Sequence, residues 1–386
     1  MIADDILKAL YAPQKAFKEI IQNPRYLGPF ILLVIFLVAQ VGASYVVASK
    51  SFVEQTMPTI DQGDAWTENA ALWQANSGVT VSNNTADFIN STYYGITSIE
   101  FAASDDGNLW METNWGTSVN CGADGFKNVS FRVKIVAPDV KPENVSLYLY
   151  SLSASNFYYD LTNALSNSVV NVWNNITLPV GSGDWSSSNA DAKWENITGL
   201  KMEFTWSSNS SIDLRIDGLF FRGVFKDPIE LYGSSVFISA TLNAVTVFLF
   251  QWLLFTGLMY VIVKGLKGNV TWKPLMVAVG FALVVVVIQA LIILAIYAAS
   301  LPNLNYPLEV LAGVPGEFDV AYQVILDAVA TVTLIGSIVQ VVVYVWVAAL
   351  GAMITRAITE FGWLKSLLVS GASFLLMLLI LGFLGI

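Results

Sequence analysis

Five apolar stretches, each long enough to cross a lipid bilayer, constrain this chain more than any other feature. They lie at residues 29–48, 236–263, 274–299, 324–353 and 367–386. About 20 apolar residues in a helix span the hydrocarbon core of a membrane. Charged residues make up only 12% of the 386 residues, which is about half the share in soluble domains. The sequence therefore predicts an α-helical membrane bundle of five transmembrane helices.

Basic residues flank these stretches on one side of the predicted membrane. Lys and Arg occur in segments 1–28, 264–273 and 356–365, whereas the connection 300–323 has neither. Segments rich in Lys and Arg stay in the cytoplasm. We therefore expect a multi-pass protein of the plasma membrane with a cytoplasmic N-terminus. Residues 49–233 and the C-terminus would then be extracytoplasmic.

Segment 49–233 alternates apolar and polar residues in several short stretches, as strands with one buried face do. The clearest are NVSFRVKIVA (128–137), LKMEFTW (200–206) and SIDLRID (211–217). Further strands are expected near 96–102, 109–115, 145–151 and 170–178. The SSNSS linker is short enough for a hairpin, which would pair Lys201 and Glu203 with Asp213 and Arg215.

Many short strands with polar turns predict an all-β sandwich inserted between the first two membrane helices. The predicted organisation is a cytoplasmic amphipathic segment (1–28), a first transmembrane helix (29–48), an extracytoplasmic β-sandwich (49–233, core about 80–225) and transmembrane helices two to five (236–386).

Composition excludes several classes of site. The chain has no histidine and one cysteine, Cys121. Histidine-based nucleophilic sites, histidine metal cages and an intrachain disulfide are therefore excluded. The formal net charge is -10, and no basic surface suits a nucleic acid. No paired carboxylates stand out in the sequence, so we expect a protein that is not an enzyme.

Asn-x-Ser/Thr sequons concentrate in the predicted outer segment and indicate N-glycosylation there. They begin at Asn83, Asn90, Asn128, Asn144, Asn175, Asn196 and Asn209. One more, at Asn269, lies on the predicted inner side. Dense sequons in a domain without disulfides suggest an archaeal cell surface.

Aromatic side chains of the outer segment are the candidate ligand contacts. Flat rings stack on sugars while neighbouring polar groups bond the hydroxyls. The candidates are Trp110, Trp115, Tyr148, Tyr150, Tyr158, Tyr159 and Trp185. Packing in the core is the competing interpretation of these residues, and it is the one we adopt for Trp173 and Trp206.

Asp105 and Asp106 form an oxygen-rich loop, DDGN. Calcium takes six to eight oxygen ligands, so a structural Ca²⁺ is one hypothesis and a solvated turn is the other. No other cofactor is expected. Asp217 is expected to fix its own turn by accepting backbone N–H groups.

Polar residues inside the predicted spans are few: Asn243, Gln251, Gln289, Asp327 and Gln340. Such groups join helices or line a path, and their scatter along the sequence favours the first role. Segment 3–25 can form short amphipathic helices broken near Pro13, lying on the inner leaflet or packed under the bundle.

Two resemblances follow from specific residues. The first rests on three patterned stretches: Trp173, Ile176 and Leu178; Trp194, Ile197, Leu200 and Met202; and Ile216, Asp217, Gly218, Leu219 and Phe221. They make segment 80–225 resemble jelly-roll, galactose-binding-like carbohydrate-binding modules. This resemblance implies a jelly-roll fold.

The second resemblance rests on the stretch before the first span: Pro13, Ala16, Phe17, Ile20, Asn23, Pro24 and Pro29. It resembles the Yip family of five-span membrane proteins. The large outer insertion departs from typical members, which have a short connection there.

These observations predict a non-enzymatic cell-surface membrane protein with an external sandwich for binding glycans or proteins. The expected partners are the lipid bilayer, other membrane or surface-layer proteins, and glycans, with the chain as an accessory subunit of their complex. A transporter or channel, or its accessory subunit, and an extracellular glycan hydrolase are the alternatives.

Overall fold

The computed structural model describes residues 2–152, 155–181 and 183–385. The chain divides into two compact units. The helical unit holds Met1–Phe52, Asp227–Leu304 and Leu326–Ile386, and the sandwich unit holds Val53–Lys226 and Asn305–Ile325.

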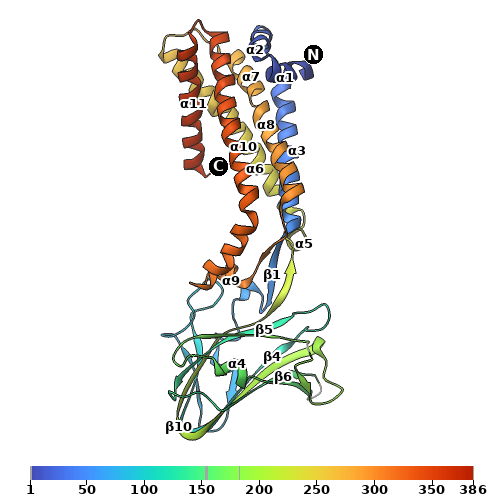
Figure 1. Cartoon of the computed structure of the whole chain (residues 1–386), viewed down its shortest axis with the longest axis vertical. Helices are drawn as coiled ribbons and strands as arrows, with labels where there is room; N and C mark the ends of the chain where they lie inside the picture. Colours follow the sequence, from blue (N-terminus) through green and yellow to red (C-terminus); the bar gives the residue numbers. More distant parts are fainter. Residues whose placement is uncertain (1, 153–154, 182, 386) are drawn as a thin grey trace. The chain divides into compact units, whose positions relative to one another are not determined.

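Five helices of the described chain are long and apolar enough to span a membrane. They are α3 (Leu27–Lys50), α6 (Ser235–Gly265), the pair α7 (Trp272–Ala282) and α8 (Val284–Ser300), α10 (Glu317–Ile358) and α11 (Trp363–Leu384). The first four predicted apolar stretches lie within these helices, and α11 covers the fifth from residue 367 to Leu384. The prediction of a five-helix membrane protein is therefore confirmed. Figure 1 shows these helices gathered into a bundle.

Two short helices precede the first span. They are α1 (Ile2–Tyr11) and α2 (Pro13–Gln22), and the break between them lies at the predicted Pro13. Phe17 and Ile20 are buried in the same apolar core as α6 and α7. Leu7 and Tyr11 stay exposed. This segment therefore packs on the bundle along one side, as the second interpretation of residues 3–25 predicts.

The sandwich unit is built from antiparallel strands joined by short helices and turns. Its strands are β1 (Ser51–Met57), β2 (Trp73–Ala75), β3 (Thr80–Asn84), β4 (Ser98–Val119), β5 (Asn128–Ala137), β6 (Asn144–Ser151), β7 (Ser155–Asp160), β8 (Asn174–Pro179), β9 (Ser186–Ser187), β10 (Ile197–Lys226) and β11 (Leu304–Tyr306). The short helices are α4 (Thr162–Ser166), α5 (Pro228–Tyr232), which belongs to the helical unit, and α9 (Leu308–Ala312).

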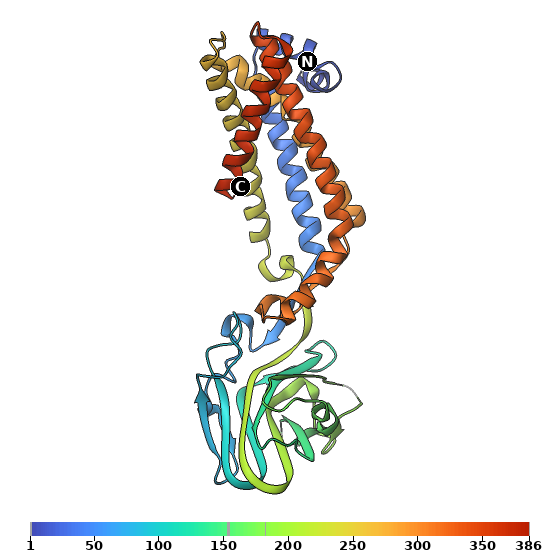
Figure 2. The ribbon, with the colours of Figure 1, turned by 60° about the vertical axis from the view of Figure 1, so that its left-hand side comes forward.

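Almost the whole of β4 pairs antiparallel with residues 197–216 of β10, and the two strands bend together. The register breaks between Thr205 and Ser210 of β10, opposite Asp106 of β4. Figure 2 shows β10, in yellow-green, turning back at this bend. Each of the two strands therefore contributes to both layers of the sandwich.

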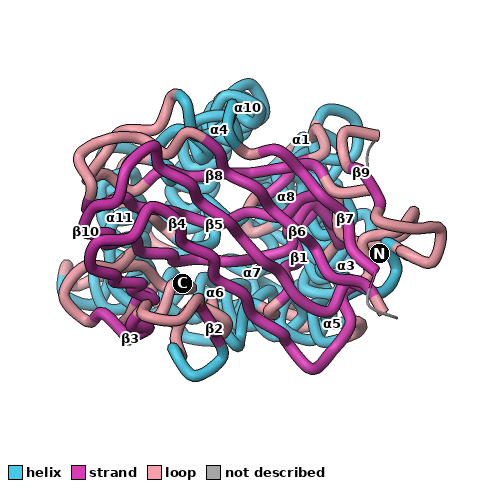
Figure 3. The backbone as a smooth tube through the Cα atoms, turned by 90° about the horizontal axis from the view of Figure 1, so that it is seen from below, coloured by secondary structure: helices cyan, strands magenta, loops and turns pink. Residues whose placement is uncertain are grey.

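The bend divides the hydrogen-bonded sheet into two layers. In the first layer the order is β3, the start of β4, the end of β10, β5 and β8. In the second layer the order is β2, the end of β4, the start of β10, β6, β7 and β9. Figure 3 draws the strands in magenta and shows β6 beside β7. The predicted fold class, a helical membrane bundle with an inserted β-sandwich, is confirmed.

The predicted hairpin at SSNSS is wrong, because residues 200–217 belong to one bent strand. Lys201 lies opposite Glu112 and Tyr148, and Arg215 lies opposite Glu100 and Lys134. A linker of small polar residues suits a bend in a strand as well as a turn between two. Only the partner strand β4, which bends at the same place, distinguishes the two.

The core lies between the layers and is filled from alternate strand positions. Phe131, Leu147, Met202 and Phe204 are each at most 1% exposed. Burying each such side chain stabilises the fold by about 1.5–3 kcal/mol. Trp206 is also buried, as predicted. Trp173 is only half-buried, and its indole N–H donates to Asp87, so its assignment to the core is wrong.

The connection 305–325 belongs to the sandwich unit, where ion pairs hold it. Arg222 of β10 donates both terminal nitrogens to Glu309, at 2.6 and 2.7 Å. Its Nε donates to Glu54 of β1 at 3.0 Å. Arg132 of β5 pairs with Glu317. Sequence patterning contains no signal for this packing, because the pattern of one segment does not show which distant side chains its carboxylates meet.

Candidate functional site

The exposed side of the second layer carries a cluster of aromatic and charged side chains. We call this cluster the aromatic face. Its members are Trp110 and Glu112 on β4, Lys201 and Glu203 on β10, Tyr148 and Tyr150 on β6, and Tyr158 on β7. All of them are half-buried.

Strand alternation places these side chains on one side. Residues Met111, Leu147, Leu149 and Met202 alternate with them and are fully buried. Successive side chains of a strand point to opposite faces of the sheet. The members of the aromatic face must therefore point away from the core.

Strand register brings the seven side chains together. Lys201 lies opposite Glu112 on one side and Tyr148 on the other, and Tyr148 lies opposite Tyr158. The two tyrosine rings are 5.4 Å apart between centroids. Directly opposed residues in a sheet have Cβ atoms about 5 Å apart. The face is therefore continuous across four strands.

Lys201 lies at the centre of the aromatic face. Its Nζ is 5.1 Å from the centroid of the Trp110 ring and 5.9 Å from that of Tyr148. The same atom is 2.6 Å from Oε1 of Glu203. A cation above a ring face is attracted by the negative π-cloud. These contacts hold the ammonium between two rings and a carboxylate.

Two phenols donate hydrogen bonds to the carboxylates of the face. Tyr150 Oη donates to Glu112 at 2.9 Å, and Tyr148 Oη donates to Glu203 at 3.3 Å. Partial burial raises the pKa of both tyrosines, and the adjacent carboxylates raise it further. Both phenols therefore stay protonated at neutral pH and remain hydrogen-bond donors.

Half-buried rings beside fixed donors and acceptors suit a ligand that has both apolar C–H surface and hydroxyl groups. Ring faces pack against C–H surface, while carboxylates, phenols and an ammonium bond hydroxyls. Sugars combine these two properties. The aromatic face therefore presents both kinds of contact that a saccharide uses.

Four of the seven predicted aromatic contacts lie on this face: Trp110, Tyr148, Tyr150 and Tyr158. The structure places the other three against the core. Trp185 is 7% exposed and its Nε1 donates to the Pro179 carbonyl, and Tyr159 packs on it. Trp115 stacks on Trp66 with centroids 4.2 Å apart.

Three charged members of the face were not predicted as site residues. Alternation in the LKMEFTW stretch places Lys201 and Glu203 on the side away from the core, but it does not show that tyrosines lie beside them. Glu112 lies in a stretch predicted only as a strand. The signal that unites all three is the pairing of β10 with both β4 and β6.

The predicted calcium loop lies at the bend of β4. Asp106 accepts hydrogen bonds from the Asn76 side chain and from the Asn108 backbone, and Asp105 has a positive φ of 54°. Among the described residues, no group of three or more acidic, cysteine or histidine side chains could hold a metal ion. Calcium binding by Asp105 and Asp106 stays a prediction.

The predicted glycosylation acceptors lie in the sandwich unit. Asn83, Asn90, Asn144, Asn175 and Asn209 are exposed, and Asn128 and Asn196 are half-buried. The amide nitrogens of Asn83 and Asn209 donate to the backbone carbonyls of Glu68 and Asp105. Their modification stays a prediction.

A pair of buried carboxyl groups lies elsewhere in the sandwich unit. Asp217 is 1% exposed and Asp64 is fully buried. Asp217 Oδ2 accepts from the Ile89 N–H, and Asp64 accepts from Thr67 and from the Gly95 N–H. Burial, together with a hydrogen bond to Asp64, raises the pKa of Asp217 to about 9. Asp217 thus accepts from a backbone N–H, as predicted, and the bond from Ile89 also ties a distant segment to this turn.

Comparison with known families gives one match. Residues 200–384 match the Yip1 domain model. The match covers the end of the sandwich and the last four spans, and the N-terminal stretch that carries the sequence resemblance lies outside it. No curated protein matches the chain.

Several solved structures are similar to the sandwich unit. One is the family 11 carbohydrate-binding module from Clostridium thermocellum, with 12% identity, 43% of this chain and 94% of that chain covered, and a TM-score of 0.29. Another is the family 30 module of a C. thermocellum cellulosomal cellulase, with 10% identity, 41% and 92% covered, and a TM-score of 0.29. A β-1,2-glucanase from Parabacteroides distasonis shows 13% identity over 40% of this chain and 24% of its own, also with a TM-score of 0.29.

Proposed function

We propose that this chain is a non-enzymatic membrane protein whose sandwich unit binds glycans through the aromatic face. The five long helices anchor it in the membrane, and the sandwich is the extracytoplasmic part. The observation that carries the proposal is the cluster of Trp110, Tyr148, Tyr158 and Lys201 on one exposed sheet surface.

Charge and hydrogen bonding on the face favour binding of an uncharged or hydroxyl-rich saccharide. Glu112 and Glu203 are already oriented by tyrosine hydroxyls, so a ligand meets acceptors that need little reordering. Pre-organised groups lose less entropy on binding. The aromatic face extends over four strands, which favours a chain of sugar rings over a single small molecule.

The same contacts favour binding over hydrolysis. Glycosidases use one carboxyl group as a proton donor and a second as base or nucleophile. Here Glu203 pairs with Lys201, and Glu112 accepts from Tyr150. Both carboxyl groups thus hold side chains of the face in place, which is a binding role and differs from the acid and base roles in a glycosidase.

We propose that the chain is an accessory subunit of a membrane or surface-layer complex, and that its sequons are glycosylated at an archaeal cell surface. The sequon density and the absence of a possible disulfide support this setting. Purification from native membranes in mild detergent should yield a discrete complex larger than the 42.1 kDa chain.

Glycan binding can be tested directly on the full chain. The protein, reconstituted in lipid nanodiscs, is applied to a glycan array that contains neutral and acidic oligosaccharides. We expect a restricted set of neutral or hydroxyl-rich glycans to bind. Absence of binding to every glycan, by a protein shown to be folded, would contradict the proposal.

A further inference from the structure

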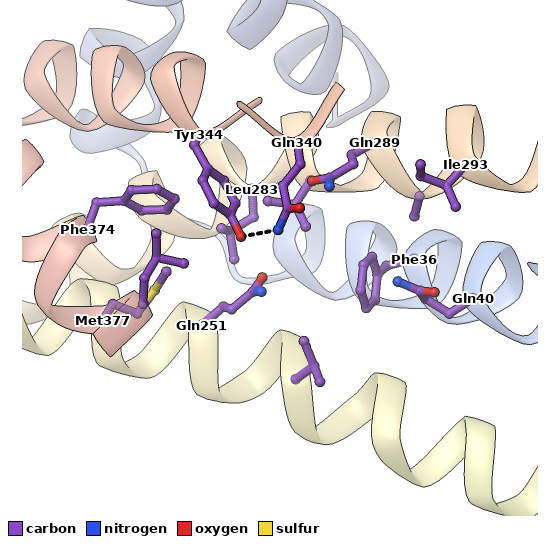
Figure 4. A pocket seen from close by; sticks show the side chains of 14 residues that line it. Phe36, Gln40, Gln251, Leu283, Gln289, Ile293, Gln340, Tyr344, Phe374 and Met377 are labelled. Atoms are coloured by element: carbon purple, nitrogen blue, oxygen red, sulfur yellow. Dashed lines mark hydrogen bonds between the residues drawn. The ribbon is translucent and has the colours of Figure 1, made fainter. Parts of the chain in front are cut away.

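The helical unit contains a pocket whose polar lining the glycan-binding proposal does not use. It has a volume of about 170 Å³ and is lined from α3, α6, α8, α10 and α11. Four glutamines line it: Gln40, Gln251, Gln289 and Gln340. Figure 4 shows Gln251, Gln289 and Gln340 turned toward the space between the helices.

The four glutamines come from four different membrane helices. Each lies well inside its helix: Gln40 in Leu27–Lys50, Gln251 in Ser235–Gly265, Gln289 in Val284–Ser300 and Gln340 in Glu317–Ile358. They are spread over 300 residues of the sequence, so the sequence alone suggests isolated polar groups. The fold brings them to one cavity between the helices, which corrects the expectation of scattered glutamines.

The amides do not join the helices to one another. The one hydrogen bond recorded among the described pocket side chains links Gln340 to Tyr344 within α10. Gln251 Oε1 is buried and has no hydrogen-bond partner. Amides that join membrane helices bond across the helix interface. Their role in holding helices together, which the sequence favours, therefore does not account for this arrangement.

An unpaired amide in a membrane interior is unfavourable, because no surrounding water satisfies it. A polar molecule in the pocket would satisfy it. Gln251 Oε1 is an acceptor, so the molecule must bring an O–H or N–H donor. No charged residue lines the pocket, so a charged molecule would be buried without a counter-charge, which is strongly unfavourable.

The size of the pocket and its access from outside further limit the class of ligand. A cavity of about 150 Å³ holds a molecule of benzene size. Phe36, Phe374 and Met377 complete the lining with apolar surface. Gln340 is exposed beside the exposed Val341 and Val342, so the polar lining reaches a surface of α10 that is suited to face lipid.

We propose that this pocket binds the uncharged, hydroxyl-bearing head of a small molecule, with the glutamine amides as its hydrogen-bond partners. The hydroxyl can belong to a lipid such as diacylglycerol or to a water-soluble polyol such as glycerol. The two sources share the chemistry that the amides recognise.

The test uses the full chain in nanodiscs and a diazirine-labelled diacylglycerol as the probe. We expect saturable photolabelling that unlabelled diacylglycerol competes away and triacylglycerol, whose hydroxyls are all esterified, does not. Phosphatidic acid, which replaces the hydroxyl by a charged phosphate, should also fail to compete. Competition by glycerol would assign the site to a water-soluble polyol, and resistance to glycerol would assign it to the lipid.

Two variants show whether the probe labels the pocket or another part of the membrane surface. Gln251→Leu and Gln289→Leu remove an amide at similar volume, and each should weaken labelling by about fivefold, as expected for one hydrogen bond. Asn243→Leu is the matched control, because Asn243 is exposed on the same helix as Gln251 and does not line the pocket. The probe should label this control variant to the same extent as the parent.

Folding of each variant is checked by a monodisperse elution profile and an unchanged thermal transition. A stabilising thermal shift of the unmodified protein by diacylglycerol, which triacylglycerol should not produce, gives a readout independent of the variants. Absence of both saturable labelling and a thermal shift would overturn the proposal. Labelling that triacylglycerol competes equally, or that both glutamine variants retain, would also overturn it.

Discussion

The Nζ atom of Lys201 lies 5.1 Å from the centroid of the Trp110 ring. The two residues come from β10 and β4, which are about 90 residues apart in the sequence. Their contact fixes a positive charge in the middle of a surface otherwise made of rings and carboxylates. This contact therefore orders side chains that we propose to bind the glycan.

Replacing Lys201 by Met should reduce glycan affinity while leaving the fold almost intact. The change removes the ammonium from Trp110 and leaves Glu203 without its ion pair. Contacts of this kind on a half-exposed surface stabilise a protein by at most about 1 kcal/mol. Thermal unfolding should thus change little, whereas calorimetric titration with a bound glycan should show weaker binding. Unchanged glycan affinity would show that Lys201 does not contribute to the binding site.

Replacing Asp217 by Asn should make the sandwich more resistant to alkaline pH. The pKa of Asp217 rises from 3.8 to about 9 on folding. A raised carboxyl pKa means that its stabilising contribution is complete below about pH 4 and is lost as the pH approaches 9. Asparagine resembles the protonated acid, because it can donate to Asp64 and accept from Ile89.

The measurement is the difference in unfolding free energy between Asp217→Asn and the parent from pH 4 to pH 9. It should shift in favour of the variant by more than about 1 kcal/mol, since one pKa unit corresponds to about 1.4 kcal/mol. A difference that stays constant with pH would show that Asp217 is ionised in the folded protein.

Replacing Arg222 by Met should destabilise the sandwich unit strongly. Glu54, only 2% exposed, would keep its charge without a cation, and Glu309 would lose both of its hydrogen bonds to the guanidinium. Removing one partner of a buried ion pair costs about 3–5 kcal/mol. Chemical unfolding monitored by tryptophan fluorescence measures this loss.

The double variant Arg222→Met, Glu54→Gln provides the comparison. It should recover part of the lost stability, because no charge is then buried at position 54. Equal stability of the single and double variants would show that the buried carboxylate is not the source of the loss.

Glycosylation should occur in the sandwich unit and not at Asn269. Asn90, Asn144 and Asn175 are exposed acceptors in that unit, whereas Asn269 follows the predicted cytoplasmic Lys264 and Lys267. Mass spectrometry of glycopeptides from the native host identifies the modified sites. A glycan on Asn269 would reverse the predicted orientation in the membrane.

Patterns within single stretches predict much of this fold. Alternation identifies the strand at 128–137 and both halves of β10, and apolar length identifies the five spans. Alternation and apolar length both depend only on which side chains a single strand or helix buries. The shared bend of β4 and β10 depends on two strands at once, so SSNSS alone suggests a hairpin.

The candidate functional residues likewise include some that a single stretch predicts and some that it does not. Alternation on β6 places Tyr148 and Tyr150 away from the core, so their exposure is predictable. Trp185 lies in a polar loop, yet it is buried because Pro179 supplies an acceptor for its indole N–H. The four glutamines of the helical unit meet only when the helices pack, so no single stretch reveals them.

Glycan affinity after loss of Trp110 shows whether the aromatic face binds the glycan. Trp110→Ala removes a ring from the aromatic face, and Trp173→Ala makes the same chemical change just before β8, in the other layer. Both proteins are titrated in nanodiscs with the glycan that binds the parent best. A nucleobase stacked on an aromatic ring contributes about 1–3 kcal/mol, and we expect a sugar ring on Trp110 to contribute at least the lower of these values. Trp110→Ala should therefore weaken binding at least about fivefold, while Trp173→Ala binds as the parent does. Equal affinity of the Trp110→Ala protein and the parent would contradict the account.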